Sequence, residues 1–151
     1  MATAFFTSRK AGRQDNEWYT PPHIKIDLEA EFGPLTDPAQ PGAVDGLIAP
    51  WTGAIFCNPP WGRGKILPWL QKGALEMDSG RVHLIIWLLP VATDTAWFHY
   101  YAWPRSSEVR FFRRRIKFLR PGALVVQQPS QAHMLVVWDE EGRMLVPEAD
   151  P

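Results

Sequence analysis

The four residues Asn58-Pro59-Pro60-Trp61 place an amide, two prolines and an indole directly after the apolar run "GAIFC", which is typical of a β-strand. Consecutive prolines fix φ and remove two N–H donors, so the strand must end there. At such a rigid exit, the Asn58 amide oxygen and the Pro59 carbonyl would offer two acceptors to one NH2 group. An amine that donates both hydrogens becomes more nucleophilic, and Trp61 would stack on a planar ring for roughly 1–3 kcal/mol. The motif therefore indicates a site that activates an amine on a flat heterocycle, although by itself it is equally typical of a rigid turn.

The elements that would hold this motif alternate between strands and helices. We expect helices over residues 20–33, 66–78 and 93–103, and strands over 34–38, 54–57, 82–90, 107–112 and, as a hairpin around a turn at 139–142, over 132–147. Thr20 as an N-cap and Gly33 as a stop favour the first helix over a strand. This order predicts an α/β sandwich with a mostly parallel sheet and an antiparallel C-terminal hairpin. Ligands of such sheets bind outside the carboxyl ends of the strands, which is where the motif is placed.

Composition sets the class of protein. The chain has 151 residues, 46% of them hydrophobic, and room for one core. We expect a flexible N-terminal arm over 1–16, one domain over 17–147 and a tail over 148–151. A single cysteine excludes an internal disulfide, and neither a membrane-length apolar run nor a signal-peptide pattern is present. These features predict a cytoplasmic protein with no membrane contact.

A basic cluster follows the strand expected at 107–112. The formal net charge is zero, with 16 basic and 16 acidic residues, so attraction to nucleic acid would require local clustering. The stretch "RFFRRRIKFLR" holds six basic residues and no acid. It is either a solvated edge strand protected by charge or a phosphate-binding patch, and we favour the second interpretation. The predicted DNA-binding residues are Arg110, Arg113, Arg114, Arg115 and Lys117. Histidine and cysteine show no ligand spacing, so no metal site is expected.

The motif and several other segments together resemble a known family. "NPPW" is similar to the Asn/Asp-Pro-Pro-aromatic motif of amino-group methyltransferases. With "DNEWYTPP", "TDPA", "DGLIAPWTGAIFC", "LLPVATDTAWFH" and "EVRFFRRRIKF", in this order, it resembles the phage Dam-like DNA N6-adenine methyltransferase family from about Asp15 to Trp138. The resemblance implies an abbreviated Rossmann-like, S-adenosylmethionine-dependent methyltransferase sandwich. It also implies a phage or prophage origin, a place in the bacterial host cytoplasm, a role against restriction, and a target adenine flipped out of DNA.

Site residues are carried over from the family position by position. The resemblance implies that Asn58 and the Pro59 carbonyl, backed by Pro60, bind the adenine N6 amino group and that Trp61 stacks on the base. It also implies a donor site, made of Tyr19, Thr20 and Pro21 beside the methionine part, Asp37 and Pro38 at the end of the first strand, and Asp45 as an acceptor for the ribose or adenine.

Two departures from the family pattern leave alternatives open. No glycine-rich loop follows Asp37, and only the 16 residues 38–53 separate it from the strand that begins at Ala54. The chain could therefore be a non-catalytic DNA-binding module derived from a methyltransferase. The same motif would also suit cytosine N4 or a glutamine amide, because each offers an NH2 group. A homodimer is a further alternative, since two copies would read a longer DNA site than one.

Overall fold

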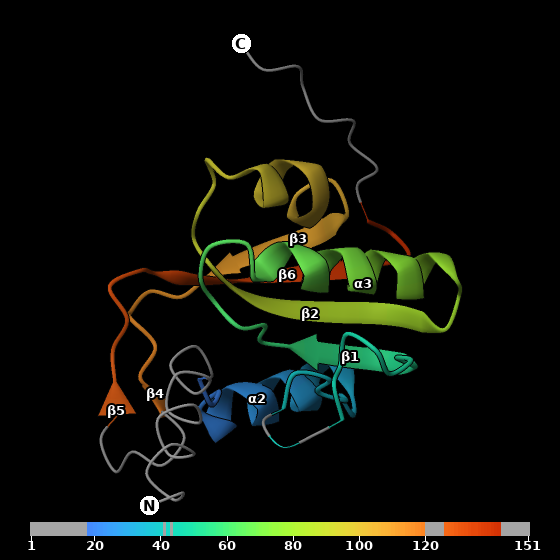
Figure 1. Cartoon of the computed structure of the whole chain (residues 1–151). Coiled ribbons are helices and arrows are strands. Elements are labelled where there is room, and N and C mark those ends of the chain that lie inside the picture. Colours follow the sequence, from blue (N-terminus) through green and yellow to red (C-terminus); the bar gives the residue numbers. More distant parts are fainter. Residues whose placement is uncertain (1–17, 41, 43, 120–125, 143–151) are drawn as a thin grey trace, which may run out of the picture.

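The computed structural model describes residues 18–40, 42, 44–119 and 126–142. Within them a four-stranded sheet has the order β1 (Gly53–Cys57), β2 (Val82–Pro90), β6 (His133–Asp139) and β3 (Ser106–Phe111). The helices are α2 (Pro22–Phe32), α3 (Ile66–Asp78) and the π-helix η1 (Phe98–Ala102). A two-stranded ladder joins β4 (Phe118–Leu119) to β5 (Val126–Gln127). Figure 1 shows α2 and α3 on different sides of the sheet.

Strand direction in the sheet is mixed. β1 and β2 are parallel, whereas β6 is antiparallel to both β2 and β3. Hence β1, β2 and β3 run in one direction and end at the same edge. The arrowheads of β1 and β3 show this shared direction in Figure 1. The prediction of a mostly parallel sheet is wrong for the hydrogen-bonded ladders, because two of the three described pairings are antiparallel.

β6 corrects the predicted hairpin. Its residues pair with β2 on one edge and with β3 on the other, so its antiparallel partners come from earlier in the chain. The turn ends in the expected place, with Gly142 N–H donating to the Asp139 carbonyl at 3.1 Å. The second predicted strand, at 143–147, lies outside the described residues, as do the arm and the tail.

Alternation along the strands produces two apolar layers. In β2, Ile85, Trp87 and Leu89 face α3, whereas Leu84, Ile86 and Leu88 face α2. Both faces of β2 are covered, which explains why its sequence is a continuous apolar run. The expected central strand is therefore confirmed, and so is the sandwich of helices around one sheet.

Helix boundaries follow local chemistry. α3 spans the predicted residues, and α2 stops at Gly33, whose φ of 85° suits glycine. The expectation that Thr20 caps α2 is wrong: the helix begins at Pro22 after Pro21, with no side-chain cap, and the Thr20 hydroxyl contacts Asn58 instead. The helix expected at 93–103 contains the five-residue π-helix η1.

The strand expected at 34–38 is reduced to one bridge. Thr36 pairs with Ile55 in parallel, through its N–H to the Ala54 carbonyl at 3.0 Å and its carbonyl to the Phe56 N–H at 2.9 Å. Proline has no N–H to donate, so Pro34 and Pro38 on either side limit the ladder. The bridge still places Asp37 beside the carboxyl end of β1.

Candidate active site

A pocket of about 290 Å³ opens at the edge where β1 ends. It combines four of the predicted site residues, Tyr19, Thr20, Asp37 and Asn58. Asn58 directly follows β1, and Asp37 follows the bridge at Thr36 that runs parallel to β1, so both lie at one edge. The rest of the lining is Trp18, Pro22, Lys25, Ile26, Glu29, Ala39, Gln40 and Phe56. The fold therefore brings together residues far apart in the sequence around one cavity.

The amide of Asn58 has a fixed orientation. Its Nδ2 donates to the Trp18 carbonyl at 3.1 Å and to the Thr20 hydroxyl at 3.2 Å. Since a backbone carbonyl can only accept, Nδ2 and not Oδ1 must face Trp18. Oδ1 is buried and has no hydrogen-bond partner among the described residues. A buried acceptor without a donor is costly, so this oxygen is available for an N–H brought by a ligand.

Trp61 is enclosed by other aromatic rings. Its ring stacks on Trp18, with centroids 5.4 Å apart and planes at 21°. The edge of Phe118 approaches it at 4.6 Å, and the His133 ring lies 4.4 Å away at 41°. Burial lowers the pKa of His133 to about 4, so its imidazole is neutral at physiological pH. In this arrangement Trp61 is half-buried and does not line the pocket, and neither do Pro59 and Pro60.

Asp37 carries an unusual carboxyl group. Burial raises its pKa to about 6, against the opposing effects of the Ala39 N–H and the charge of Lys25. The Ala39 N–H donates to Oδ1 at 2.9 Å. A carboxylate that is desolvated and incompletely compensated favours a ligand that brings positive charge.

Sequence reasoning missed two charged residues of this pocket. Lys25 and Glu29 lie one turn apart on α2, with Nζ and Oε1 at 3.9 Å, and both line the cavity. Their i, i+4 spacing is ordinary for an exposed helix face, so the sequence alone did not distinguish them. The sequence did offer one signal: these residues lie four and eight positions after Pro21, which places them on one face of the helix that begins there.

The remaining residues that are predicted to bind the methyl donor lie outside the pocket lining. Pro21 is buried and precedes α2. Pro38 contacts the next loop, where a Cβ on Gly46 would lie 2.2 Å from the Pro38 carbonyl oxygen. Asp45 is exposed, and its Oδ1 accepts the Leu47 N–H at 3.0 Å within a turn. Its predicted role, to accept a hydrogen bond from the ribose or adenine of the methyl donor, stays a prediction.

A second, basic pocket of about 480 Å³ lies where the chain leaves β3. Its lining is His23, Ile24, Phe112, Arg113, Arg114, Arg115, Ile116 and Lys117. Residues 112–117 are not a strand, so the alternative interpretation of a charged edge strand is wrong for these residues. Arg115 donates to the Ser130 carbonyl, a neutral partner, and no acid among the described residues pairs with Arg113, Arg114 or Lys117.

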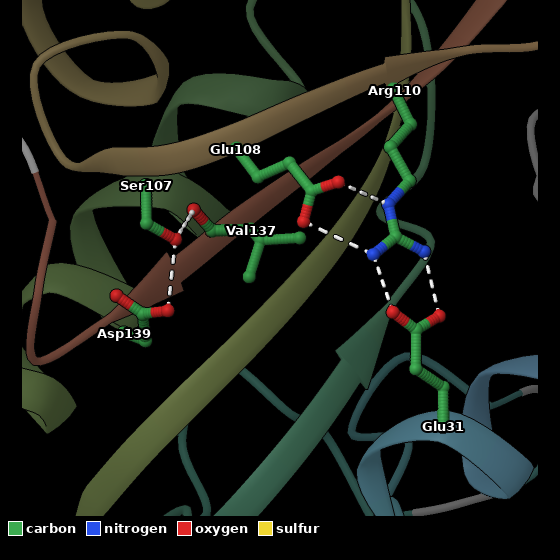
Figure 2. A network of polar contacts seen from close by, with 6 residues as sticks. All are labelled: Glu31, Ser107, Glu108, Arg110, Val137 and Asp139. Atoms are coloured by element: carbon green, nitrogen blue, oxygen red, sulfur yellow. Dashed lines mark hydrogen bonds and ion pairs between the residues drawn. The ribbon is translucent and has the colours of Figure 1, made fainter.

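Arg110 differs from these cations because it pairs with acidic side chains. Figure 2 shows its guanidinium between the carboxylates of Glu31 on α2 and Glu108 on β3. Hydrogen bonds to both acids raise the pKa of Arg110 above its ordinary value. Its charge is therefore compensated within the protein, and its main visible effect is to fasten α2 to the sheet edge.

Fold and site together define a small α/β protein whose pocket offers a fixed amide acceptor at the carboxyl end of a strand. A family model described as DNA N-6-adenine-methyltransferase (Dam) matches residues 42–147. The chain belongs to this family, so at family level it is a DNA adenine-N6 methyltransferase. No curated protein and no solved structure matches the chain. Among the described residues, no helix is long and apolar enough to cross a membrane, and no group of three or more His, Cys, Asp or Glu could hold a metal ion.

Proposed function

We propose that this chain transfers a methyl group from S-adenosylmethionine to N6 of an adenine flipped out of DNA. One observation carries the proposal: the buried Oδ1 of Asn58 has no partner, and the Trp18 carbonyl and Thr20 hydroxyl hold the amide so that Oδ1 points away from them. This is the acceptor that the N6 amino group requires. From the resemblance alone, we further propose a phage or prophage origin and protection of DNA against restriction.

The chemistry requires positioning more than acid–base groups. Asn58 Oδ1 and the Pro59 carbonyl accept the two N6 hydrogens, which directs the nitrogen lone pair at the donor. When bound, S-adenosylmethionine supplies an electrophilic methyl: the N–C bond forms, the S–C bond breaks with its electron pair left on sulfur, and N6 loses one proton to solvent. Correct alignment of two reactants can supply much of the rate enhancement in such an in-line transfer.

Charges in the pocket fit the amino-acid part of the donor. Asp37 is negative and Lys25 positive, and both line the cavity with Tyr19 and Thr20. An α-amino acid brings an ammonium and a carboxylate, which would pair with Asp37 and Lys25 respectively. Glu29, on the next turn of α2, is an acceptor suited to ribose hydroxyls. With these pairings, polar partners for the methyl donor come from α2 and Asp37. The short segment 38–53, which has no glycine-rich loop, does not have to supply them.

DNA contact is proposed for Arg113, Arg114, Arg115 and Lys117. They follow the carboxyl end of β3, which is the edge that also carries Asn58 after β1. Both pockets include residues from the start of α2: Pro22 and Lys25 line one, and His23 and Ile24 line the other. A DNA strand whose phosphate enters the basic pocket would thus approach the edge of the sheet that holds Asn58. Arg110 is left out because Glu31 and Glu108 already compensate its charge.

The deciding experiment is methyl transfer from isotopically labelled S-adenosylmethionine to unmethylated DNA, followed by nucleoside digestion and mass analysis. We expect N6-methyladenine from the wild-type chain and none from Asn58→Ala with an unchanged circular dichroism spectrum. Methylation that persists in Asn58→Ala would contradict the mechanism. N4-methylcytosine as the product would keep the mechanism and change the substrate. No transfer, together with no donor binding by calorimetry, would favour the non-catalytic DNA-binding module.

A further inference from the structure

Trp18 contacts the candidate site through both its backbone and its side chain. Its carbonyl accepts from Asn58 Nδ2, and its indole stacks on Trp61 at a centroid distance of 5.4 Å and an interplanar angle of 21°. Stacked aromatic rings prefer centroid separations of roughly 4.5–7 Å with near-parallel planes. The Trp18 indole therefore sits on Trp61 much as a nucleobase would.

The other rings around Trp61 cannot yield so easily. Phe118 on β4 is fully buried, and His133 at the start of β6 is 1% exposed. His133 also pairs with Pro90 in the central ladder of the sheet, so moving it would disturb β2. Trp18 is only half-buried and lines the pocket. A base that stacks on Trp61 must therefore replace the Trp18 ring.

The backbone at Trp18 is held independently of that ring. The peptide unit between Trp18 and Tyr19 is anchored at both ends: its carbonyl accepts from Asn58 at 3.1 Å, and its N–H donates to the Leu119 carbonyl at 2.8 Å. Rotation of the indole about χ1 breaks neither bond. The side chain can leave Trp61 while the carbonyl continues to orient the Asn58 amide.

We propose that Trp18 is a positioning residue with two separate effects, which rests on the proposed function. In the free protein its indole occupies the face of Trp61 that the target adenine takes, and it swings aside when the base arrives. Its carbonyl keeps Asn58 Oδ1 directed at the N6 amino group throughout. Base binding then replaces the contacts of the Trp18 ring with Trp61 and Phe118 by a stack of the base on Trp61, which weakens the contribution of the base to DNA affinity.

The test compares how much the target base contributes to binding in different variants. The probes are a single-stranded oligonucleotide carrying an adenine that the wild-type chain methylates and the same strand with an abasic site there, with S-adenosylhomocysteine present. The Kd of the abasic strand divided by the Kd of the adenine strand measures how much the base contributes to binding. We expect Trp18→Ala to raise this ratio about 2- to 10-fold, because no stack must be broken, and Trp18→Phe to raise it less. Trp97→Ala, at a half-buried tryptophan packed on the α3 side of the sheet, should leave it unchanged.

The outcomes separate this proposal from the function on which it rests. A raised ratio in Trp18→Ala that disappears in Trp18→Ala/Trp61→Ala supports it. An unchanged or lower ratio in folded Trp18→Ala and Trp18→Phe, while Asn58→Ala still abolishes methylation, overturns the displacement of Trp18 and leaves the proposed function intact. If the wild-type chain methylates no adenine, both proposals fail together.

Discussion

At the scale of single residues, the site depends on how one amide is held. Asn58 could face the pocket with either its NH2 or its oxygen, and these two orientations have opposite chemical consequences. The Trp18 carbonyl and the Thr20 hydroxyl take the NH2 and leave the oxygen free. The Thr20 side chain, which the sequence suggests as a helix cap, thus acts on the acceptor that an amine substrate would meet.

Thr20→Val tests this contact, because valine keeps the shape of threonine and removes the oxygen that accepts from Nδ2. A neutral hydrogen bond contributes about 0.5–1.5 kcal/mol, so we expect the single-turnover rate of methyl transfer to fall about 2- to 10-fold. Thr20→Ser keeps the hydroxyl and should retain most of the rate. If Thr20→Val raised only the KM for the donor and left the rate unchanged, the role in orienting Asn58 would be wrong.

The raised pKa of Asp37 makes stability depend on pH and, if the proposed function holds, donor binding as well. Its pKa is about 6 in the folded protein against an ordinary 3.8, so the folded state holds this proton more tightly than the unfolded state. The free energy of unfolding is therefore lowered as pH rises through this interval, and the charged carboxylate destabilises the fold at pH 8. Asp37→Asn keeps an oxygen for the Ala39 N–H but has no charge. We expect it to be about 1–3 kcal/mol more stable than the wild type at pH 8, with little difference near pH 3.

The same substitution should abolish the pH dependence of donor binding. In the wild type, affinity for S-adenosylmethionine should be constant above pH 7 and fall about tenfold per pH unit below pH 6, as Asp37 becomes neutral. Calorimetric titrations of both proteins from pH 5 to pH 8, with urea unfolding at pH 3 and pH 8, measure both effects. Equal donor affinity in wild type and Asp37→Asn at pH 8 would exclude Asp37 from the donor site.

At the scale of elements, α3 approaches the sheet closely at Gly73. A Cβ built there would lie 2.4 Å from the Trp87 ring, which is fully buried in β2. Gly73→Ala gains helix propensity of about 1 kcal/mol, but the overpacking costs more and must displace Trp87 or α3. We expect a net loss of about 1–3 kcal/mol in the free energy of unfolding, measured by urea denaturation. Leu75→Ala, at a 68% exposed position on the same helix, is the matched control and should change stability little. A Gly73→Ala protein as stable as the wild type would show that this contact has room to relax.

The same elements show what the sequence could and could not predict. Periodicity located α3 and β2, because an amphipathic helix and a doubly covered strand leave clear patterns. It missed the position of β6, since insertion of 133–139 between β2 and β3 depends on long-range pairing that residues 132–147 do not encode locally. The Asn58 motif was recognisable from its prolines, whereas Lys25 and Glu29 became part of the pocket only through the packing of α2.

At the scale of the whole molecule, a chain with zero formal net charge still carries an uncompensated basic surface. Acids neutralise Arg110, Arg105 and Arg81 through ion pairs. The cations after β3 lack such acids among the described residues, and they lie at the edge of the sheet that carries Asn58. Charge is thus segregated by position along the strands, with the uncompensated cations at the carboxyl end that holds the candidate site.

The salt dependence of DNA affinity tests whether the cations after β3 contact DNA phosphates. Each phosphate neutralised in a duplex contributes about 0.9 to the slope of log affinity against log salt, so Arg113→Gln should reduce the slope by about 0.9 and Arg113→Gln/Arg114→Gln/Lys117→Gln by up to about 2.7. Arg105→Gln removes the same charge as Arg113→Gln from a site that pairs with Asp78 at the opposite edge, and it should leave the slope unchanged. Fluorescence anisotropy of a labelled duplex between 50 and 200 mM salt provides the measurement. A triple variant that folds and keeps the wild-type slope would show that DNA approaches another face; equal losses in Arg105→Gln and Arg113→Gln would show that net charge, and not the basic pocket, attracts it.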